Sequence, residues 1–338
     1  MSGRLMRSEM AEQPDVLARL VARFDETVER LRALVPAPLA GVSFVARGSS
    51  DHAAVYGRYL AELASGRPAA LAAPSLQTLY GARVDYSGWL VVALSQSGAT
   101  PEIETVTRQL QASGARTIAI VNQEQSPLGE AVELVIPLGA GDERAVPATK
   151  TVTAELVAVA AVAAALGELP FERPAFDALP EAVAQVLATP EAPQALAERW
   201  AGAQRTFVAA RGLLLAAALE TALKIKETTG VLAEGMSAAD LRHGPIAAIG
   251  PGAPLLALDG GGVTSPDISE LLRLAAARGA DVARCGIGDA DVPLPETPEA
   301  LAAVTAVVRG QQLALALADR RGLDPDAPAG LSKVTATK

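Results

Sequence analysis

The sequence has 338 residues, of which 50% are hydrophobic and 20% are charged, and its formal net charge is −9. This length suggests two domains or one large one, with a core large enough to fold without disulfides or a structural metal. The single cysteine, Cys285, excludes a disulfide framework and a multi-thiolate metal site, and two histidines are too few for most histidine-based metal centres. The acidic balance, without any run of Lys or Arg, argues against a nucleic-acid partner.

The beginning of the chain carries charges without the apolar core of a secretory signal. The most apolar stretch, residues 156–166, is only about half as long as a bilayer-spanning helix, and its Ala and Val residues predict a buried helix instead. No membrane partner is expected, and the predicted location is cytoplasmic.

Apolar residues at helical spacing predict a packing helix over about residues 9–34. Three apolar segments typical of buried strands follow, with helical patterns between them, at 44–48, 90–94 and 117–121. The same order returns at 207–212, 255–258 and 281–285. Apolar strands alternating with helices indicate βαβ units and parallel sheets covered on both faces. The repeat predicts an α/β chain with two tandem lobes, each a doubly wound parallel sheet flanked by helices, related by a pseudo-twofold axis.

The expected domain order follows from this repeat and from the distribution of proline. The predicted parts are an N-terminal helical segment at 1–36, a first lobe at 37–170, a proline-punctuated connection at 171–195, a second lobe at 196–325 and a C-terminal tail at 326–338.

Two strand ends in the first lobe are rich in polar side chains. The residues are Ser49, Ser50, Ser95, Gln96, Ser97 and Thr100. Ligands of doubly wound sheets bind at the carboxyl ends of strands, and helix N-termini attract phosphate without Arg or Lys. An ordinary Ser/Thr helix cap is the alternative, but it needs one hydroxyl rather than several. The corresponding loop of the second lobe carries Asp259 instead, so we expect one phosphate site per chain, in the first lobe.

Lysine is rare in this chain. Among the 29 basic residues, the lysines are Lys150, Lys224, Lys226, Lys333 and Lys338. A lysine amine, unlike a guanidinium, can lose its proton and attack a carbonyl. These few lysines are therefore candidates for chemistry, with chance retention on the surface as the alternative.

The densest group of ionisable residues lies on a predicted helix. Glu220, Lys224 and Glu227 have the i, i+4, i+7 spacing of one helix face, for which a solvent-facing salt-bridged stripe is the common explanation. Further along, His243 precedes a Gly-Pro turn, where a structural and a functional histidine are equally compatible with the pattern. Lys333 lies in a polar tail that would ordinarily be surface.

Taken in order, five segments resemble the sugar isomerase (SIS) domain proteins, most closely the isomerase half of glutamine–fructose-6-phosphate aminotransferases. The segments are 47–50, 95–100, 146–150, 220–227 and 241–245. The resemblance reaches Lys333 and implies tandem SIS lobes, in agreement with the internal repeat. It also implies a phosphorylated sugar as substrate and no metal or cofactor.

The resemblance further implies roles for individual residues. The sugar phosphate is held by Ser95, Gln96, Ser97 and Thr100, and the sugar site is lined by Ser49, Ser50 and the backbone of Val146. Glu227 corresponds to the base that moves a proton between C1 and C2, and Lys224 assists it. His243 corresponds to the ring-opening residue, which the neighbouring subunit of a homodimer contributes. Lys333 corresponds to a lysine that forms a Schiff base with the ketose, in a tail that closes the site.

Some residues depart from the family pattern. The synthases begin with a glutaminase domain whose nucleophile is an N-terminal cysteine, whereas Ser2 follows the first residue here, and Ala99 stands where the synthase loop usually has Glu. The expected function is therefore a glucosamine-6-phosphate deaminase that forms fructose 6-phosphate and ammonia. A fructosamine-6-phosphate deglycase, a synthase isomerase half working with a separate ammonia source, and a non-catalytic sugar-phosphate sensor are the alternatives.

Overall fold

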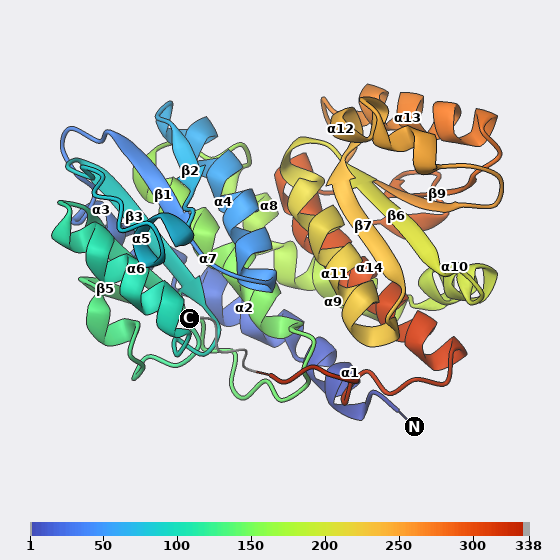
Figure 1. The fold of residues 1–338 in the computed structure, drawn as a ribbon, viewed down its shortest axis with the longest axis horizontal. Coiled ribbons are helices and arrows are strands. Elements are labelled where there is room, and N and C mark those ends of the chain that lie inside the picture. Colours follow the sequence, from blue (N-terminus) through green and yellow to red (C-terminus); the bar gives the residue numbers. More distant parts are fainter. Residues whose placement is uncertain (1, 334–338) are drawn as a thin grey trace. The chain divides into compact units, whose positions relative to one another are not determined.

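The computed structural model describes residues 2–333, which form two compact units (Figure 1). The first-sheet unit comprises Asp15–Glu143 and Lys150–Pro170, and the second-sheet unit comprises residues 2–14, Arg144–Thr149 and 171–333. Each unit is built around a five-stranded sheet. Residues 334–338, the end of the expected tail, lie outside the described part of the chain.

The N-terminal segment consists of three short helices rather than the single helix predicted for residues 9–34. They are α1 (Arg4–Ala11), α2 (Gln13–Ala22) and α3 (Phe24–Arg32). Pro14 explains the first break, because proline has no amide hydrogen and its ring would clash with the carbonyl four residues earlier in a continuous helix. The apolar spacing was therefore right about burial and wrong about continuity.

All strands of the first sheet are parallel, and their order is β2-β1-β3-β4-β5. The strands are β1 (Gly41–Val45), β2 (Ala69–Leu71), β3 (Trp89–Ser95), β4 (Arg116–Val121) and β5 (Leu134–Pro137). The helices around them are α4 (Ser49–Ser65), α5 (Ser75–Thr78), α6 (Pro101–Ala112) and α7 (Lys150–Leu166). The buried stretch predicted at 156–166 is the C-terminal part of α7.

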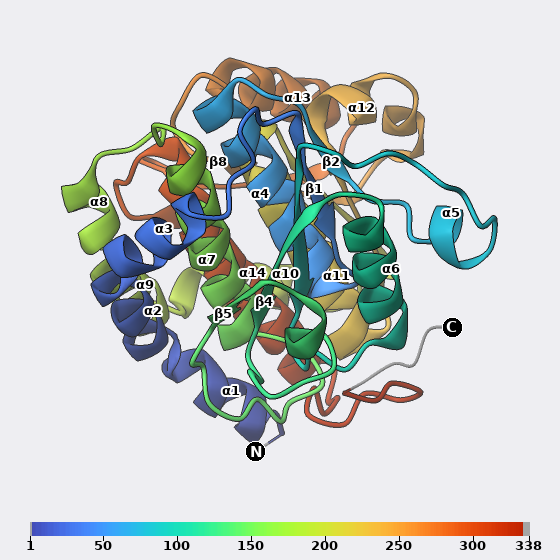
Figure 2. The same ribbon diagram turned by 90° about the vertical axis from the view of Figure 1, so that its left-hand side faces the viewer.

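Helices cover both faces of the first sheet (Figure 2). Ile103 and Val106 of α6 belong to the same core cluster as Val91 of β3. Successive residues of a strand point to opposite faces, and the ring of Phe44, next to Val45 of that cluster, lies against Gly57 of α4. This is the doubly wound arrangement that the sequence predicts.

The second sheet is also parallel, with the order β10-β9-β8-β6-β7. Its strands are β6 (Arg205–Ala210), β7 (Leu232–Ser237), β8 (Pro254–Asp259), β9 (Asp281–Ile287) and β10 (Val292–Leu294). Read from β7 to β10, this order is that of the first sheet from β2 to β5, so the predicted repeat is confirmed in the topology of the two sheets.

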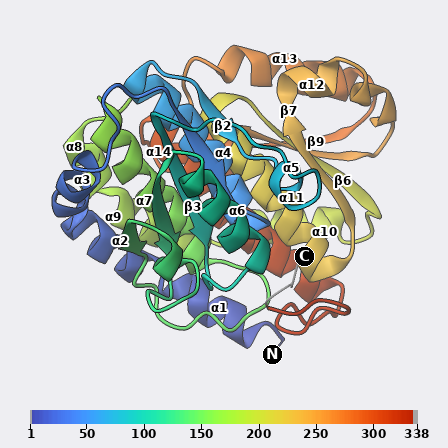
Figure 3. The same ribbon diagram turned by 60° about the vertical axis from the view of Figure 1, so that its left-hand side comes forward.

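Helices also lie on both sides of the second sheet (Figure 3). On one side are α12 (Ala238–Arg242) and α13 (Ser265–Ala277), and on the other are α11 (Leu215–Thr229) and α14 (Glu299–Arg320). The expected connection at 171–195 is largely helical. It contains α8 (Arg173–Asp177), α9 (Leu179–Ala188) and the start of α10 (Glu191–Trp200).

All six predicted strands are present, and the four that the sequence pattern missed are β2, β5, β7 and β10. These four are the edges of the two sheets. Three of them, β2, β5 and β10, are only three or four residues long, too short for an apolar run to stand out. The fourth, β7, is partly exposed, as Leu232 and Glu234 illustrate.

One helix, α14, is long and apolar enough to cross a membrane by length and composition alone. The whole of its most apolar window is nevertheless buried inside the fold, as in a core helix. It packs closely on α11, where a Cβ added to Gly310 would lie 2.9 Å from Thr221 Cβ.

Candidate active site

The strand order of the first sheet determines where a ligand site is expected. In the order 2-1-3-4-5 the chain leaves adjacent strands β1 and β3 in opposite directions, and the crevice at their carboxyl ends is the usual binding position. Val45 of β1 is paired with Ala93 of β3. The loops that follow these strands therefore lie next to each other, and all six polar residues predicted from the first lobe lie in these loops or at the ends of the elements they join.

The loop between β3 and α6 is folded by its own hydroxyl groups. Ser95 Oγ accepts a hydrogen bond from the amide of Gly98 (3.2 Å) and lies 3.5 Å from Thr100 Oγ1. Ser97 Oγ accepts from the amide of Ala99 (3.2 Å). Gly98 has φ +62°, and a Cβ there would lie 2.6 Å from Ser126 Cβ, so the tight turn requires glycine.

Thr100 occupies the N-cap position of α6, but its hydroxyl makes no capping hydrogen bond. The ordinary capping explanation for this residue is therefore wrong. Because the first amides of a helix have no partner within the helix, those of α6 remain available to an anion at the same edge as the hydroxyls.

The loop between β1 and α4 carries the other two predicted hydroxyls. Ser49 begins α4 and is partly exposed, whereas Ser50 is buried and donates a hydrogen bond to Glu155 Oε1 of α7 (2.8 Å). Ser50 therefore fastens the start of α4 to α7. Of this pair, Ser49 is the one whose side chain is more accessible.

In the second-sheet unit, α11 brings together the three ionisable residues of the i, i+4, i+7 pattern. Lys224 Nζ lies 3.3 Å from Glu220 Oε1 and is also paired with Glu227 Oε2. The Lys224 and Glu220 side chains are 1% exposed, and that of Glu227 is 19% exposed. The solvent-facing stripe is therefore wrong, and the cluster is a buried one with Glu227 at its accessible end.

The electrostatics of this cluster are those of one ammonium between two carboxylates. Burial raises the pKa of Glu227 above its usual range, and the negative charge of Glu220 adds to the rise, while Lys224 opposes it. Burial alone would lower the pKa of Lys224, but the two carboxylates outweigh it and raise this pKa. At neutral pH the cluster thus keeps a charged lysine beside a carboxylate that accepts a proton more readily than an exposed glutamate.

The remaining predicted residues of this unit lie on separate segments. Lys333 is close enough to Glu227 for its positive charge to offset a small part of the rise in the pKa of Glu227. Val146 is partly buried in the segment 144–149, where the carboxylate of Glu9 accepts hydrogen bonds from the neighbouring Ala145 amide (3.2 Å). His243 is exposed after α12, and its amide donates to Asp240 O (3.0 Å).

The loop after β8 corresponds by topology to the hydroxyl loop after β3, but acidic side chains of the protein fill it. Asp259 accepts hydrogen bonds from the amide of Gly261 (3.0 Å) and from Ser265 Oγ (2.6 Å). Glu299 of α14 accepts from Thr264 Oγ1 (2.7 Å) and from the amide of Val263 (3.2 Å). The hydroxyls at the start of α13 are therefore already engaged by carboxylates.

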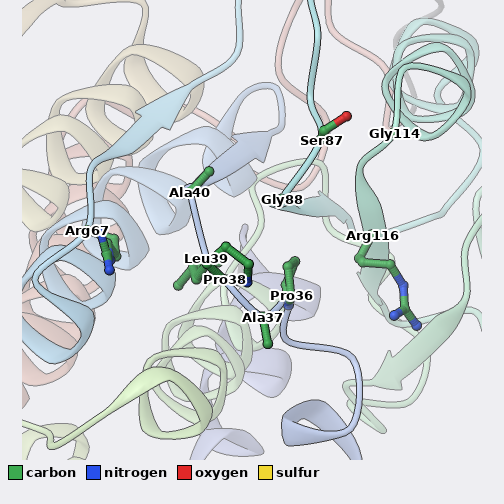
Figure 4. Close-up of a pocket in the computed structure, with 10 residues that line it drawn as sticks. All are labelled: Pro36, Ala37, Pro38, Leu39, Ala40, Arg67, Ser87, Gly88, Gly114 and Arg116. Atoms are coloured by element: carbon green, nitrogen blue, oxygen red, sulfur yellow. The ribbon is translucent and has the colours of Figure 1, made fainter.

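A surface hollow of about 670 Å³ lies at the opposite, amino edge of the first sheet (Figure 4). Its lining includes residues 36–40, Arg67 and Arg116, the last of which forms an ion pair with Glu133. Most of the other lining residues are Pro, Ala and Gly, which bring few polar side chains together. The carboxyl edge is thus the better candidate for the active site.

Comparison with known proteins agrees with this architecture. The SIS domain family matches the sequence over residues 41–165 and 201–294. The chain belongs to the SIS domain family. The two matched segments contain the two sheets described above, one in each unit.

Among other SIS proteins, a glutamine–fructose-6-phosphate aminotransferase of Thermococcus kodakarensis is 32% identical over 97% of this chain and 57% of its own length. The corresponding protein of Symbiobacterium thermophilum is 34% identical over 97% of the chain and 58% of its own length. This chain thus spans somewhat more than half the length of these relatives. A candidate phosphosugar isomerase from Silicibacter pomeroyi DSS-3 has a similar crystal structure, with a TM-score of 0.85, 33% identity, and coverage of 96% of this chain and all of that one.

The glucosamine-6-phosphate deaminase of Thermotoga maritima shares the fold, with a TM-score of 0.81, 22% identity, and coverage of 98% of this chain and all of that one.

Two groups at the sites described above were not among the predicted site residues. Glu220 is the second carboxylate on Lys224, and its spacing already placed it on the same helix face. Arg47 is paired with Glu102 beside the hydroxyl loop, a contact that no local sequence pattern reveals.

Proposed function

We propose that this SIS protein is a glucosamine-6-phosphate deaminase that converts glucosamine 6-phosphate and water to fructose 6-phosphate and ammonia. The observation that carries the proposal is the cluster on α11, where Glu227 combines a raised pKa, partial exposure and a buried lysine partner. A positioned carboxylate of this kind can move a proton between adjacent carbons of an open-chain sugar.

The phosphate of the substrate is assigned to the hydroxyl loop after β3. Ser95, Ser97 and Thr100 supply hydroxyls, Gln96 supplies an amide, and the uncapped start of α6 supplies backbone amides. Ser49 and Ser50, with the backbone of Val146, are assigned to the sugar. A site of this composition selects phosphorylated sugars over free ones because helix N-termini favour the phosphate charge.

In the proposed reaction His243 opens the sugar ring to the aldehyde. Glu227 then removes the proton from C2 while O1 takes up a proton from water, and Glu227 returns its proton to C1 of the resulting enolamine, which leaves an imine at C2. The amine of Lys333 adds to this carbon and ammonia departs, after which water hydrolyses the lysine imine and releases fructose 6-phosphate. Lys224 stays protonated beside Glu227 and stabilises its carboxylate form.

The proposed working unit is a cytoplasmic homodimer in which His243 acts on the active site of the neighbouring subunit. The exposure of His243 after α12 supports this assignment, because its side chain is accessible to another chain. A monomer that retains full turnover at assay concentration would contradict it.

In the proposed reaction the active-site residues release nitrogen as free ammonia and do not use glutamine. The one cysteine of the sequence, Cys285, is buried, and burial raises the pKa of its thiol to about 12, so it does not supply a thiolate for glutamine hydrolysis. This distinguishes the chemistry available here from that of a complete glutamine-dependent synthase.

The test is ammonia release from a panel of phosphorylated amino sugars, with fructose 6-phosphate measured in the same samples. Equimolar ammonia and fructose 6-phosphate from glucosamine 6-phosphate is the expected result. Release of an amino acid from fructosamine 6-phosphates instead would assign a deglycase. Tight binding of sugar phosphates without turnover of any of them would assign a sensor.

A further inference from the structure

Arg47 lies in the loop between β1 and α4 and connects this loop to the start of α6, which follows the hydroxyl loop. It follows β1, and its Nε donates a hydrogen bond to Glu102 Oε2 in the first turn of α6 (3.0 Å). The Glu102 side chain is 8% exposed, whereas that of Arg47 is 45% exposed. The Arg47 guanidinium is thus held by Glu102 at Nε, while the side chain as a whole remains nearly half exposed.

The charges around the hydroxyl loop explain why a cation is needed there. In the segments 47–51 and 95–104, Arg47 is the only Lys or Arg, whereas the carboxylates are Asp51, Glu102 and Glu104. Glu104 is paired with Arg108 further along α6 (2.9 Å). Asp51 and Glu102 lie in the first turns of α4 and α6, the two helices that begin beside the hydroxyls.

A phosphate dianion bound at the start of α6 would meet these two carboxylates at the same edge. Like charges so placed weaken anion binding unless a cation offsets them. Arg47 is paired with Glu102, and its positive charge also acts on Asp51. The planar guanidinium has further N–H groups in a fixed fork that suits phosphate oxygens.

We propose that Arg47 is a phosphate-binding residue of this site, held at the start of α6 by Glu102, and that it sets the affinity for the phosphorylated part of the substrate. This inference rests on the proposed function, since it takes the hydroxyl loop as the phosphate site. It assigns a role to a residue that the motif-based set of site residues leaves without one.

A purely structural role for the pair makes different predictions. An ion pair that only fastens the β1–α4 loop to α6 would, when broken, lower thermal stability without changing the affinity for phosphate. Both quantities are therefore measured on each variant. Calorimetric titrations with inorganic phosphate, fructose 6-phosphate and unphosphorylated fructose separate phosphate binding from sugar binding.

The variants are R47A, R47K, E102Q and the double variant R47A/E102Q, with R108A as the matched control. R108A removes the other Arg–Glu pair of α6, which lies away from the start of the helix. R47A is expected to weaken fructose 6-phosphate and phosphate binding by about tenfold to hundredfold, the usual cost of losing hydrogen bonds to a charged group. R47K should lose less, and R108A should bind like the wild type.

The double variant is the decisive comparison. Without Arg47, Glu102 is an uncompensated negative charge beside the phosphate, so R47A/E102Q should bind fructose 6-phosphate more tightly than R47A. Unchanged affinity in R47A, or a loss that E102Q does not relieve and that follows the melting temperature alone, would overturn the proposal. So would a wild-type protein that binds neither phosphate nor fructose 6-phosphate.

These outcomes are distinct from failure of the proposed reaction. If the wild-type protein binds fructose 6-phosphate but releases no ammonia from glucosamine 6-phosphate, the deaminase assignment fails. The comparison of R47A with the double variant then still decides the role of Arg47, because it depends on binding alone.

Discussion

Replacing Glu220 by Gln tests whether the buried cluster on α11 controls the proton-accepting ability of Glu227. The change keeps the shape of the side chain and removes the negative charge of one of the two carboxylates paired with Lys224. Carboxylates that contact the same ammonium lie within roughly 6 Å of each other, and at an effective dielectric constant of about 20 their repulsion is about 2.8 kcal/mol. Partial exposure of Glu227 screens this repulsion, so the effect of E220Q on the pKa of Glu227 should be smaller than this full energy implies.

The sign of the shift follows from the charge removed. Glu220 raises the pKa of Glu227, so E220Q lowers it, and the acid limb of the profile of kcat/KM against pH should move to lower pH. The assay is ammonia release from glucosamine 6-phosphate across the pH range, with melting temperatures to verify folding. E181Q, which removes an exposed glutamate of α9, is the control and should leave the limb in place. An acid limb that does not move, or that moves to higher pH in E220Q, would refute the role assigned to Glu220.

Three further changes test other parts of the structure. G310A should lower the free energy of unfolding by about 1–3 kcal/mol in denaturant titrations, because the new Cβ would lie 2.9 Å from Thr221 Cβ. The control G202A, with open space around the new Cβ, should be close to neutral. Equal stabilities of the two variants would contradict close packing of α11 on α14. K333R should abolish turnover while retaining fructose 6-phosphate binding, since a guanidinium keeps the charge but forms no imine, and full activity would remove the Schiff-base step. Cys285 should react with a thiol reagent only after unfolding, because it is buried with a pKa raised to about 12; rapid labelling of the native protein would show that it is accessible.

The sequence was sufficient to predict the features that depend on local pattern. The six central strands are rich in apolar residues because both faces of each sheet are covered, and the hydroxyls of the loop after β3 are close together in the chain. The repeat of strand and helix order also predicted that the two sheets would share a topology.

What the sequence could not supply depends on contacts between distant segments. The spacing of Glu220, Lys224 and Glu227 places them on one helix face, but their burial depends on how α11 packs in the fold. The pairing of Arg47 with Glu102 joins residues 55 positions apart. The edge strands were missed because β2, β5 and β10 are only three or four residues long and β7 is partly exposed.

The loops after β3 and β8 show that two sheets of the same topology need not both be able to bind an anion. At the first loop the uncapped helix start is left open to an incoming anion, whereas at the second the carboxylates of Asp259 and Glu299 already hold Ser265, Thr264 and the neighbouring amides. A carboxylate donated by the protein costs no loss of translational freedom and cannot diffuse away, so a free phosphate competes poorly with it. The two sheets thus share a topology but differ at this loop: the first is suited to bind the substrate phosphate, and the second is occupied by carboxylates of the protein itself.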